Sequence, residues 1–455
     1  MNAVAWRKAA PAPAWLLPCL GGGIVALTLV ALSLHVPGSI WVGTLARKDA
    51  VVALMLASGL LYFAAVMVLL RGATSVHVLW HVLAISTALR VGLLCAPPFM
   101  SSDIYRYVWD GRVQAAGHNP YQYIAADPAL TPLRDNNIYP RINRVEYAHT
   151  IYPPAAQLIF AAVGQVSQTV TAMKIAMVLL ESCGVAAMIA MLRAAGRPAA
   201  HILIYAWNPL AAWAIAGDGH IDGAAIGFLG LAMWAMTARR DGIAGALLSG
   251  AILTKLLPLA VAPALWRRYH WRLPLVCACC IVAFYAIYAN VGWRVLGFLP
   301  AYTSEEGLTG GSGFWLLRAV GDLVTLPSWI APLYLAVAVI SLAAVALWVG
   351  FAQPRDTARD PVSLARNVAL LATATVFAMS PHYTWYYAWL ALPACLVPWP
   401  SLIWLATAPI LLYSDPWHDE ILLPTAVFVP FLCLAARDLL RARAAPHPIL
   451  AGAPT

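Results

Sequence analysis

The sequence predicts an all-α polytopic membrane protein, and three observations lead to this fold class. Hydrophobic residues make up 62% of the 455 residues and charged residues only 10%, whereas a soluble domain carries about 25% charged residues. Apolar runs recur near the length of roughly 20 residues that a helix needs to cross the hydrocarbon core of a bilayer. These runs lack the alternating pattern of a membrane β-barrel, so their backbone is expected to satisfy its hydrogen bonds within helices.

We expect one transmembrane domain over residues 1–455, with about 11–13 spanning helices. Twelve apolar segments are the candidate spans: Trp15–His35, Val51–Leu70, Val78–Phe99, Val170–Leu192, His201–Ala216, Ile221–Thr237, Pro274–Asn290, Trp329–Gly350, Asn367–Ser380, Tyr383–Val397, Ser401–Tyr413 and Ile421–Ala436. The first is predicted to be an uncleaved span, because its apolar run is longer than that of a signal peptide.

Two further apolar segments do not fit a simple count of crossings. Gly242–Trp266 has arginine pairs on both sides, so it is predicted to be a re-entrant hairpin that turns near Lys255. Pro153–Gln165 is too short to cross and is predicted to be a partial or tilted helix.

The formal net charge of +9 reflects the positive-inside rule rather than an affinity for nucleic acid, because the basic residues gather at segment ends that can all be cytoplasmic. Both termini are then inside. The outer segments are the loops at 36–50, 100–150, 292–313 and 414–420 and the turn at 217–220.

The loop over 100–152 is the first large outer loop and the most polar part of the chain. Residues 101–150 contain five acids, five arginines and six of the eighteen tyrosines, so their net charge is zero. Such a balance predicts a folded polar cap rather than a basic membrane anchor. Tyrosine-rich polar surfaces suit sugars, because rings cover C–H faces while charged groups bind hydroxyls.

A helix is predicted at the start of this loop. Ser101 or Ser102 can cap a helix that runs to about Ala116, with Gly117 as its left-handed stop. Asp103 then lies in the first turn, where the helix dipole favours an ionised carboxylate. Asp103, Arg106 or Tyr107, Asp110 and Gln114 share one face. The alternative is that Asp103 only helps to cap the helix and Asp110 pairs with Arg106.

The rest of the loop is predicted to contain a turn at His118–Tyr121 and a short helix near Ala129–Asn137. The chain re-enters the membrane at Tyr152–Pro154, where proline fits the first turn of a helix.

Three further polar islands lie in apolar surroundings. The first holds Asn208, Asp218, His220 and Asp222; it is a sugar-binding or divalent-metal site, or simply a polar turn between helices. The second is Lys255, which either binds an anion such as a phosphate or extends to the interface. The third is SPHYTWYY with His382 and Tyr383, which either binds phosphate or polyprenyl lipid or forms an aromatic belt.

The order of these motifs resembles the GT-C superfamily of membrane glycosyltransferases. D-x-Y-R-Y-x-W-D-G-R and G-x-N-P-Y come first, followed by Y-P-P-A-A-Q, W-N-P-L, G-x-G-H-x-D, T-K-x-x-P and a late P-H-Y-x-W. Within the superfamily the chain is most similar to bacterial polyprenol-phosphate-mannose-dependent alpha-mannosyltransferases, over roughly residues 100–400. It departs from the superfamily in having its second acid seven residues after the first and three spans before the loop.

The resemblance implies a GT-C-type bundle in the bacterial inner membrane, with a periplasmic cavity. The donor is then a polyprenyl-phosphate sugar, the acceptor a glycan or glycolipid, and the transfer inverting. By motif position Asp103 is the catalytic base, and Asp110 is a second catalytic candidate. Residues expected at the donor phosphate or lipid are Arg112, Lys255, His382 and Tyr383. Residues expected at the acceptor or sugar are Arg106, Tyr107, Tyr152, Gln157, Asn208, Asp218, His220 and Asp222.

No metal ligand is assigned and no cofactor is expected, although a divalent metal stays an open alternative. The lack of a glycine-rich phosphate loop agrees with a lipid-linked donor rather than a nucleotide sugar. Two other functions use similar ligands: a flippase or transporter, which predicts internal repeats, and a ligase of polyprenyl-linked saccharides, for which we expect a late charged loop.

Overall fold

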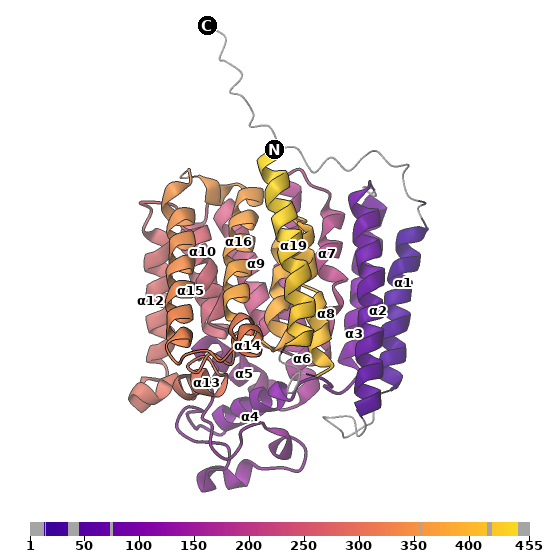
Figure 1. Ribbon diagram of the computed structural model, residues 1–455. Helices are drawn as coiled ribbons and strands as arrows, with labels where there is room; N and C mark the ends of the chain where they lie inside the picture. The colour runs from indigo at the N-terminus through magenta and orange to yellow at the C-terminus, as the bar shows by residue number, and fades with distance from the viewer. Residues whose placement is uncertain are drawn as a thin grey trace.

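The protein is described by a computed structural model that covers residues 13, 15–34, 45–72, 76–354, 356–415 and 421–444. The described residues form helices and no strand, which confirms the all-α prediction. Figure 1 shows a bundle of upright helices with a smaller cap at its lower end. The loops predicted at 36–50 and 414–420 lie largely outside the described residues, and both chain ends lie wholly outside them.

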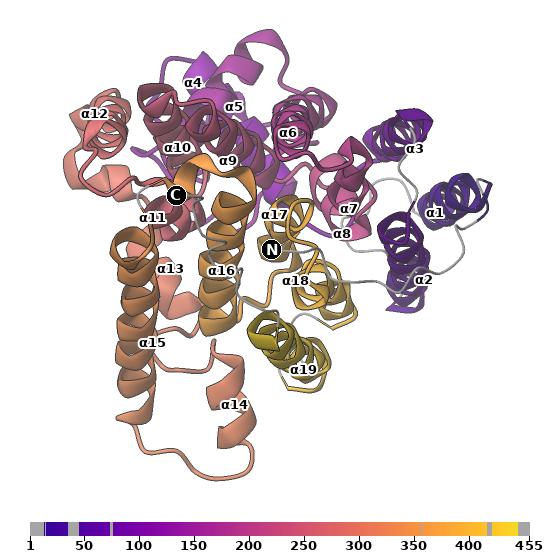
Figure 2. The same cartoon turned by 90° about the horizontal axis from the view of Figure 1, so that it is seen from above.

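Three long helices precede the cap and stand together at one edge of the bundle (Figures 1 and 2). They are α1 (Leu16–Ser33), α2 (Leu45–Leu70) and α3 (Val76–Leu94). A buried ion pair joins α3 to the bundle, because Arg90 on α3 lies 2.6 Å from Glu181. The hydroxyl of Tyr205 donates a further hydrogen bond to Glu181 at 2.8 Å.

The cap is formed by the early polar loop and the short apolar helix that follows it. Its elements are α4 (Asp103–Ala115), the 3-10 turns η1 (Pro128–Leu133) and η2 (Tyr139–Arg141), and α5 (Pro154–Val166). Helix α4 has the predicted bounds, and Gly117 follows it at φ +83°. Ser102 is the N-cap residue, but its side chain makes no capping hydrogen bond, so the predicted serine cap is not formed by Ser102. The helix predicted near Ala129–Asn137 is instead the shorter η1, because Pro132 has no N–H with which to continue an α-helix.

The middle of the chain, after the cap, contains two long helices with shorter elements between them. They are α6 (Val170–Ala194), η3 (Ala199–Ile202), α7 (Leu203–Ala206), α8 (Pro209–Ala212), the π-turn η4 (Trp213–Gly217) and α9 (Asp222–Thr237). The span predicted at His201–Ala216 is bent by 65° at Asn208–Pro209. The α-region is disfavoured for a residue before proline, and Asn208 has an extended backbone (ψ 117°), which accounts for the break at this dipeptide.

The next segment reverses direction as the sequence predicts. Helix α10 (Asp241–Thr254) ends at Lys255, and the chain returns through η5 (Leu257–Val261) and α11 (Ala262–Leu265). Its two ends meet again, because Arg267 lies 4.0 Å from Asp241. Arg359 also pairs with Asp241, at 2.5 Å. The segment is therefore a hairpin whose tip is Lys255.

The second half of the chain alternates long helices with broken ones. Its elements are α12 (Arg272–Ala286), η6 (Ala289–Leu296), α13 (Leu299–Glu305), α14 (Trp315–Gly321), α15 (Ile330–Leu347), η7 (Trp348–Ala352), η8 (Thr357–Arg359), α16 (Pro361–Met379), η9 (Thr384–Leu390), α17 (Ala391–Ala394), α18 (Pro400–Leu405), η10 (Ala408–Tyr413) and α19 (Leu422–Ala444). The single span predicted at Tyr383–Val397 is wrong, because this segment consists of the 3-10 turn η9 and the one-turn α17.

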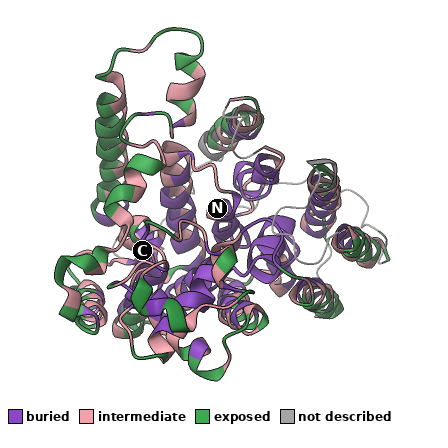
Figure 3. Ribbon diagram, turned by 90° about the horizontal axis from the view of Figure 1, so that it is seen from below, coloured by how far each residue is buried: buried purple, intermediate pink, exposed green. Residues whose placement is uncertain are grey.

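Within the described residues, seven helices are long and apolar enough to cross a membrane, or up to nine if each bent pair is one span. This multi-pass architecture is the predicted one, but the expected 11–13 spanning helices exceed it. Four further apolar helices in the same part of the chain have only 10–17 residues. Figure 3 shows the buried residues gathered in the middle of the bundle and the exposed ones around its rim.

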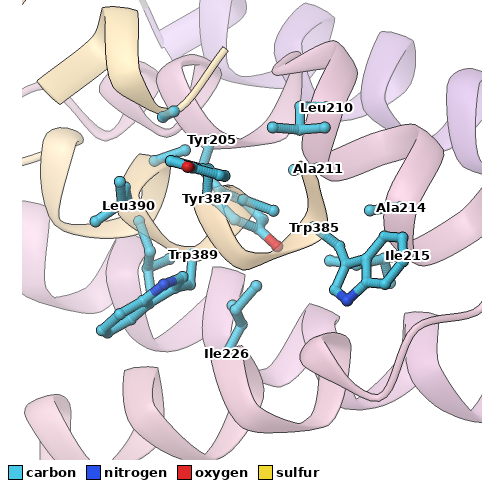
Figure 4. Packing of buried hydrophobic residues seen from close by; sticks show 14 of the residues in the cluster. Tyr205, Leu210, Ala211, Ala214, Ile215, Ile226, Trp385, Tyr387, Trp389 and Leu390 are labelled. Atoms are coloured by element: carbon cyan, nitrogen blue, oxygen red, sulfur yellow. The ribbon is translucent and has the colours of Figure 1, made fainter. Parts of the chain in front are cut away.

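A tightly packed core lies beside the site. Figure 4 shows Tyr205, Ile215 and Ile226 packed around Tyr387 and Trp385, which come from η9. All five side chains are buried. Since core side chains of this size have few alternative positions, the short irregular elements that carry them form a rigid support for the residues next to them.

Candidate active site

A cavity of about 1210 Å³ lies where the cap meets the membrane bundle. Eight of the fourteen site residues predicted from the sequence line it: Asp103, Arg106, Tyr107, Tyr152, Asp222, Lys255, His382 and Tyr383. They come from four separate parts of the chain, namely the early loop, the start of α9, the tip of the hairpin and the segment before η9. The other six do not line it.

Asp103 faces this cavity from the first turn of α4, with about 20% of its side chain exposed. Its Oδ1 accepts a hydrogen bond from Asn143 at 2.8 Å, and its backbone N–H donates to the Ser101 hydroxyl at 3.3 Å. Burial raises the pKa of the Asp103 carboxyl above its usual range, although Asn143 and Lys255 oppose the shift. A carboxylate with a raised pKa is a stronger base than an exposed one.

Lys255 and Asp222 form an ion pair in the cavity wall. The Lys255 ammonium lies 2.7 and 2.9 Å from the two carboxylate oxygens and 3.7 Å from the ring centre of Tyr386. The lysine therefore has the anionic partner that a charge at this depth requires, and it comes from the chain itself. The sequence reasoning assigned Asp222 to the sugar and did not connect it with Lys255.

His382 and Tyr383 share a second acid, Glu306, which the sequence reasoning missed. His382 Nε2 lies 3.0 Å from Glu306, and the Tyr383 hydroxyl donates to it at 3.2 Å. Arg144 of the cap pairs with both Glu305 and Glu306. The signal available was the adjacent acid pair at 305–306, which contains the only acids of the 292–313 loop.

Asp110 does not line the cavity; it is buried between α4 and α5. Its carboxylate pairs with Arg106 at 2.8 Å and accepts hydrogen bonds from Thr150 at 2.6 Å and Gln157 at 2.8 Å. Arg106 also donates to the carbonyl of Ala148. Of the alternatives left open for Asp110, the ion pair with Arg106 is the one that forms, and it ties the returning loop to α4.

Asp218 and His220 lie directly behind Asp103. Asp218 accepts hydrogen bonds from the backbone N–H groups of Phe99 and Met100, at 2.8 and 2.9 Å, and so fixes the chain that leads into α4. The His220 ring is stacked on Trp385 with centroids 4.0 Å apart, and its Nδ1 lies 3.8 Å from Asp103 Oδ2.

Two remaining candidates stabilise backbone away from the cavity. Arg112 pairs with Asp135 at 2.8 Å and donates to the carbonyl of Leu133. It does not line the cavity, so its position does not fit the expected contact with a donor phosphate. Asn208 caps α8 through the Ala211 N–H and donates to Thr407 at 2.9 Å.

The divalent-metal alternative finds little support in this geometry. Asp218 binds backbone amides, Asp222 binds Lys255 and His220 stacks on an indole, so the three side chains face different neighbours. Among the described residues no group of three or more His, Cys, Asp or Glu side chains is arranged to hold a metal ion.

The comparisons with known proteins give one match. The family model described as alpha-(1->6)-mannopyranosyltransferase, N-terminal domain, of the MptA_B family, matches residues 14–272, more than half of the 455 residues. The matched part includes Asp103, Asp222 and Lys255, whereas Glu306 and His382 lie beyond it. No curated protein and no solved structure matches the chain significantly.

Proposed function

The chain belongs to the MptA_B family of alpha-(1->6)-mannopyranosyltransferases, and from this membership we propose that it transfers mannose from a polyprenyl-phosphate donor to a glycan or glycolipid acceptor. The observation that carries the proposal is the single cavity that joins Asp103 to the Asp222–Lys255 pair. A base and a cation at one site are what a sugar transfer from phosphate requires.

The walls of the cavity support a lipid-linked donor. Away from Asp103 the lining becomes apolar and is formed by side chains of η5, α15 and α16, among them Leu259, Ala343 and Leu371. An isoprenoid chain can pass from the bilayer onto such a surface without contacting polar groups, while its phosphate needs the polar end. We place the phosphate near Lys255 and His382.

In the proposed mechanism Asp103 takes the proton from an acceptor hydroxyl. The acceptor oxygen bonds to C1 of the mannose on the face opposite the phosphate, so the configuration inverts. The bond between C1 and the phosphate oxygen breaks with its electron pair on the lipid phosphate. Lys255, with His382, stabilises that developing charge. Arg106, Tyr107 and Tyr152 are proposed to border the sugar, and Asp110, Arg112, Gln157, Asn208 and Asp218 to hold the framework.

We propose that the site opens to the periplasm of a bacterial inner membrane, with both termini in the cytoplasm. Helix α9 runs for 16 residues, about 24 Å, from Asp222 at the cavity to the Arg239–Arg240 pair. The arginines around Asp241 lie at that same far end. Because cytoplasmic loops carry the excess of basic residues, the cap faces the other side.

Asp103→Asn tests this function. The variant keeps the size of the side chain but loses the base, so we expect transfer from polyprenyl-phosphate mannose to fall by about 100- to 10,000-fold. The measurement is the initial rate in membranes, with expression and thermal stability recorded in parallel. Glu146→Gln is the matched control, since Glu146 is an exposed acid of the same loop.

Full activity of Asp103→Asn contradicts the mechanism. A panel of polyprenyl-phosphate sugars in the same assay identifies the donor, and no transfer from any of them contradicts the donor class. The proposal includes no cofactor, and repeating the assay with a chelator tests that part separately.

A further inference from the structure

His220 is a buried polar side chain whose ring makes no conventional hydrogen bond. It is 1% exposed, and neither Nδ1 nor Nε2 has a hydrogen-bond partner within the part of the chain that the structure describes. Buried polar groups are nearly always paired, so an exception beside a catalytic candidate requires a reason.

The position of this ring is fixed by its surroundings. The turn that carries it is set by Gly219 at φ +75°, and the His220 N–H donates to the carbonyl of Ala214 at 3.0 Å. The ring lies nearly parallel to the indole of Trp385, at an angle of 23°. An imidazole held in this way cannot turn freely to find another partner, so its orientation is part of the site.

The fixed ring faces one particular atom of Asp103. Oδ1 of Asp103 accepts the hydrogen bond from Asn143, and His220 Nδ1 lies 3.8 Å from the other oxygen, Oδ2. This separation is longer than a hydrogen bond, but contacts of catalytic groups commonly shorten once substrate is bound. Oδ2 is thus flanked by a donor that needs less than about 1 Å of movement to reach it.

The imidazole acts here as a neutral group. Burial, together with the positive charge of Lys255, holds the pKa of His220 well below its usual range. A neutral imidazole carries a single N–H, which it can place on Nδ1, toward Asp103. It therefore offers a hydrogen bond to the carboxylate without adding a charge.

We propose that His220 is a positioning residue, which donates its Nδ1–H to Oδ2 of Asp103 and holds that carboxylate toward the acceptor hydroxyl. The inference rests on the proposed role of Asp103 as the base. The proton removed from the acceptor ends on Asp103, and the imidazole keeps its own proton throughout. Trp385 contributes by fixing the plane of the ring, and Asn143 restrains the carboxylate from the other side.

The groups that face Asp103 determine how a pH profile is interpreted. The charged ones are Arg144 from the cap, Asp222 from α9 and Lys255 from the hairpin tip. The titratable tyrosines are Tyr107, Tyr152, Tyr383 and Tyr413. None of these groups is changed in a variant of His220. A shift in the acidic limb of its kcat–pH profile therefore reports the loss of the hydrogen bond between His220 and Asp103.

Two substitutions separate the hydrogen bond from the packing. His220→Phe keeps a flat ring against Trp385 and loses the donor. His220→Asn loses most of the stacking but retains an N–H donor near the position of Nδ1. We expect kcat of His220→Phe to fall about 10- to 100-fold, as for a misplaced catalytic group, with an unchanged KM for polyprenyl-phosphate mannose.

The pH dependence gives the second readout. A hydrogen bond to the ionised form lowers a carboxyl pKa, so its loss moves the acidic limb of the kcat profile of His220→Phe to higher pH. His220→Asn is expected to recover most of the rate and the original limb. His118→Phe is the control, because His118 stacks edge-on against Tyr123 in the cap and lies outside the cavity.

A His220→Phe protein with wild-type rate and wild-type acidic limb overturns the inference. So does an equal loss in both variants without a shift of the limb, which is the result of a purely structural role. Donor binding in membranes and thermal stability show whether each variant is folded. If Asp103→Asn is inactive while His220→Phe is normal, only this inference fails; if Asp103→Asn is active, the proposed function fails first.

Discussion

At the scale of single residues, Lys255 carries a charge that is already balanced before any substrate binds. Its ammonium contacts both oxygens of Asp222 and lies over the ring of Tyr386. A phosphate at this site has to share the lysine with Asp222. The contribution of Lys255 to donor binding is therefore the difference between two charge-assisted contacts.

Lys255→Ala is expected to weaken donor binding more than it slows saturated turnover. Charge-assisted hydrogen bonds contribute about 1.5–3 kcal/mol. Since the phosphate replaces the contact with Asp222, we expect a net contribution of about 1 kcal/mol, which corresponds to a rise of about fivefold in KM for the donor. The variant also leaves Asp222 buried and unpaired. The double variant Lys255→Ala, Asp222→Ala removes this second effect, so it should regain thermal stability without regaining donor affinity. An unchanged KM in both variants contradicts the phosphate role.

Single positions also show what sequence reasoning could find. The helix with Asp103 in its first turn was predictable, because a first-turn acid and a glycine stop are local signals. The pairs Lys255–Asp222 and His382–Glu306 were not, because their partners lie 33 and 76 residues apart in the chain. Nothing in local spacing says which acid will meet which base after packing.

At the scale of elements, the cap depends on the close approach of α4 and α5. A side chain added at Gly111 would meet the carbonyl oxygen of Phe160 at 2.4 Å, and one at Gly164 would meet the backbone of Gly111 at 2.7 Å. The two helices therefore touch along their backbones. This contact fixes the direction in which α4 presents Asp103.

Gly164→Ala is expected to force α4 and α5 apart. Overpacking of this kind costs about 1–3 kcal/mol, so the thermal midpoint in detergent should fall and the transfer rate with it. Gly22→Ala is the control, since a methyl group there meets nothing within 4 Å. Equal midpoints for the two variants contradict the close packing of the cap.

Hydropathy also predicted some elements wrongly. It located the long helices and the hairpin tip, but it joined Tyr383–Val397 into a span that the structure divides into η9 and α17. The 65° bend at Asn208–Pro209 was missed for the same reason. Apolarity reports where the chain is buried but does not report whether the buried chain is one continuous helix. At Asn208–Pro209 the proline explains the break.

At the scale of the whole molecule, the proposed orientation predicts which surfaces face the cell exterior. Cysteine at position 146, in Glu146→Cys, is expected to react with a membrane-impermeant maleimide in intact spheroplasts. Cysteine at position 240, in Arg240→Cys, is expected to react only after the membrane is opened. Both wild-type side chains are exposed. The reverse pattern contradicts the periplasmic site. The wild-type chain, treated with the same maleimide, measures the background from its own cysteines.

The internal salt bridge between Asp222 and Lys255 affects which anions can bind to the lysine. A small free anion must displace a carboxylate that is already in place, and it brings no other contact to offset that loss. In the proposed function, a lipid-linked phosphate also brings its isoprenoid chain, whose packing contacts with the apolar cavity wall add to the contacts of the phosphate. If the proposed function holds, the lysine that Asp222 already occupies binds free phosphate weakly and favours phosphate carried by a lipid.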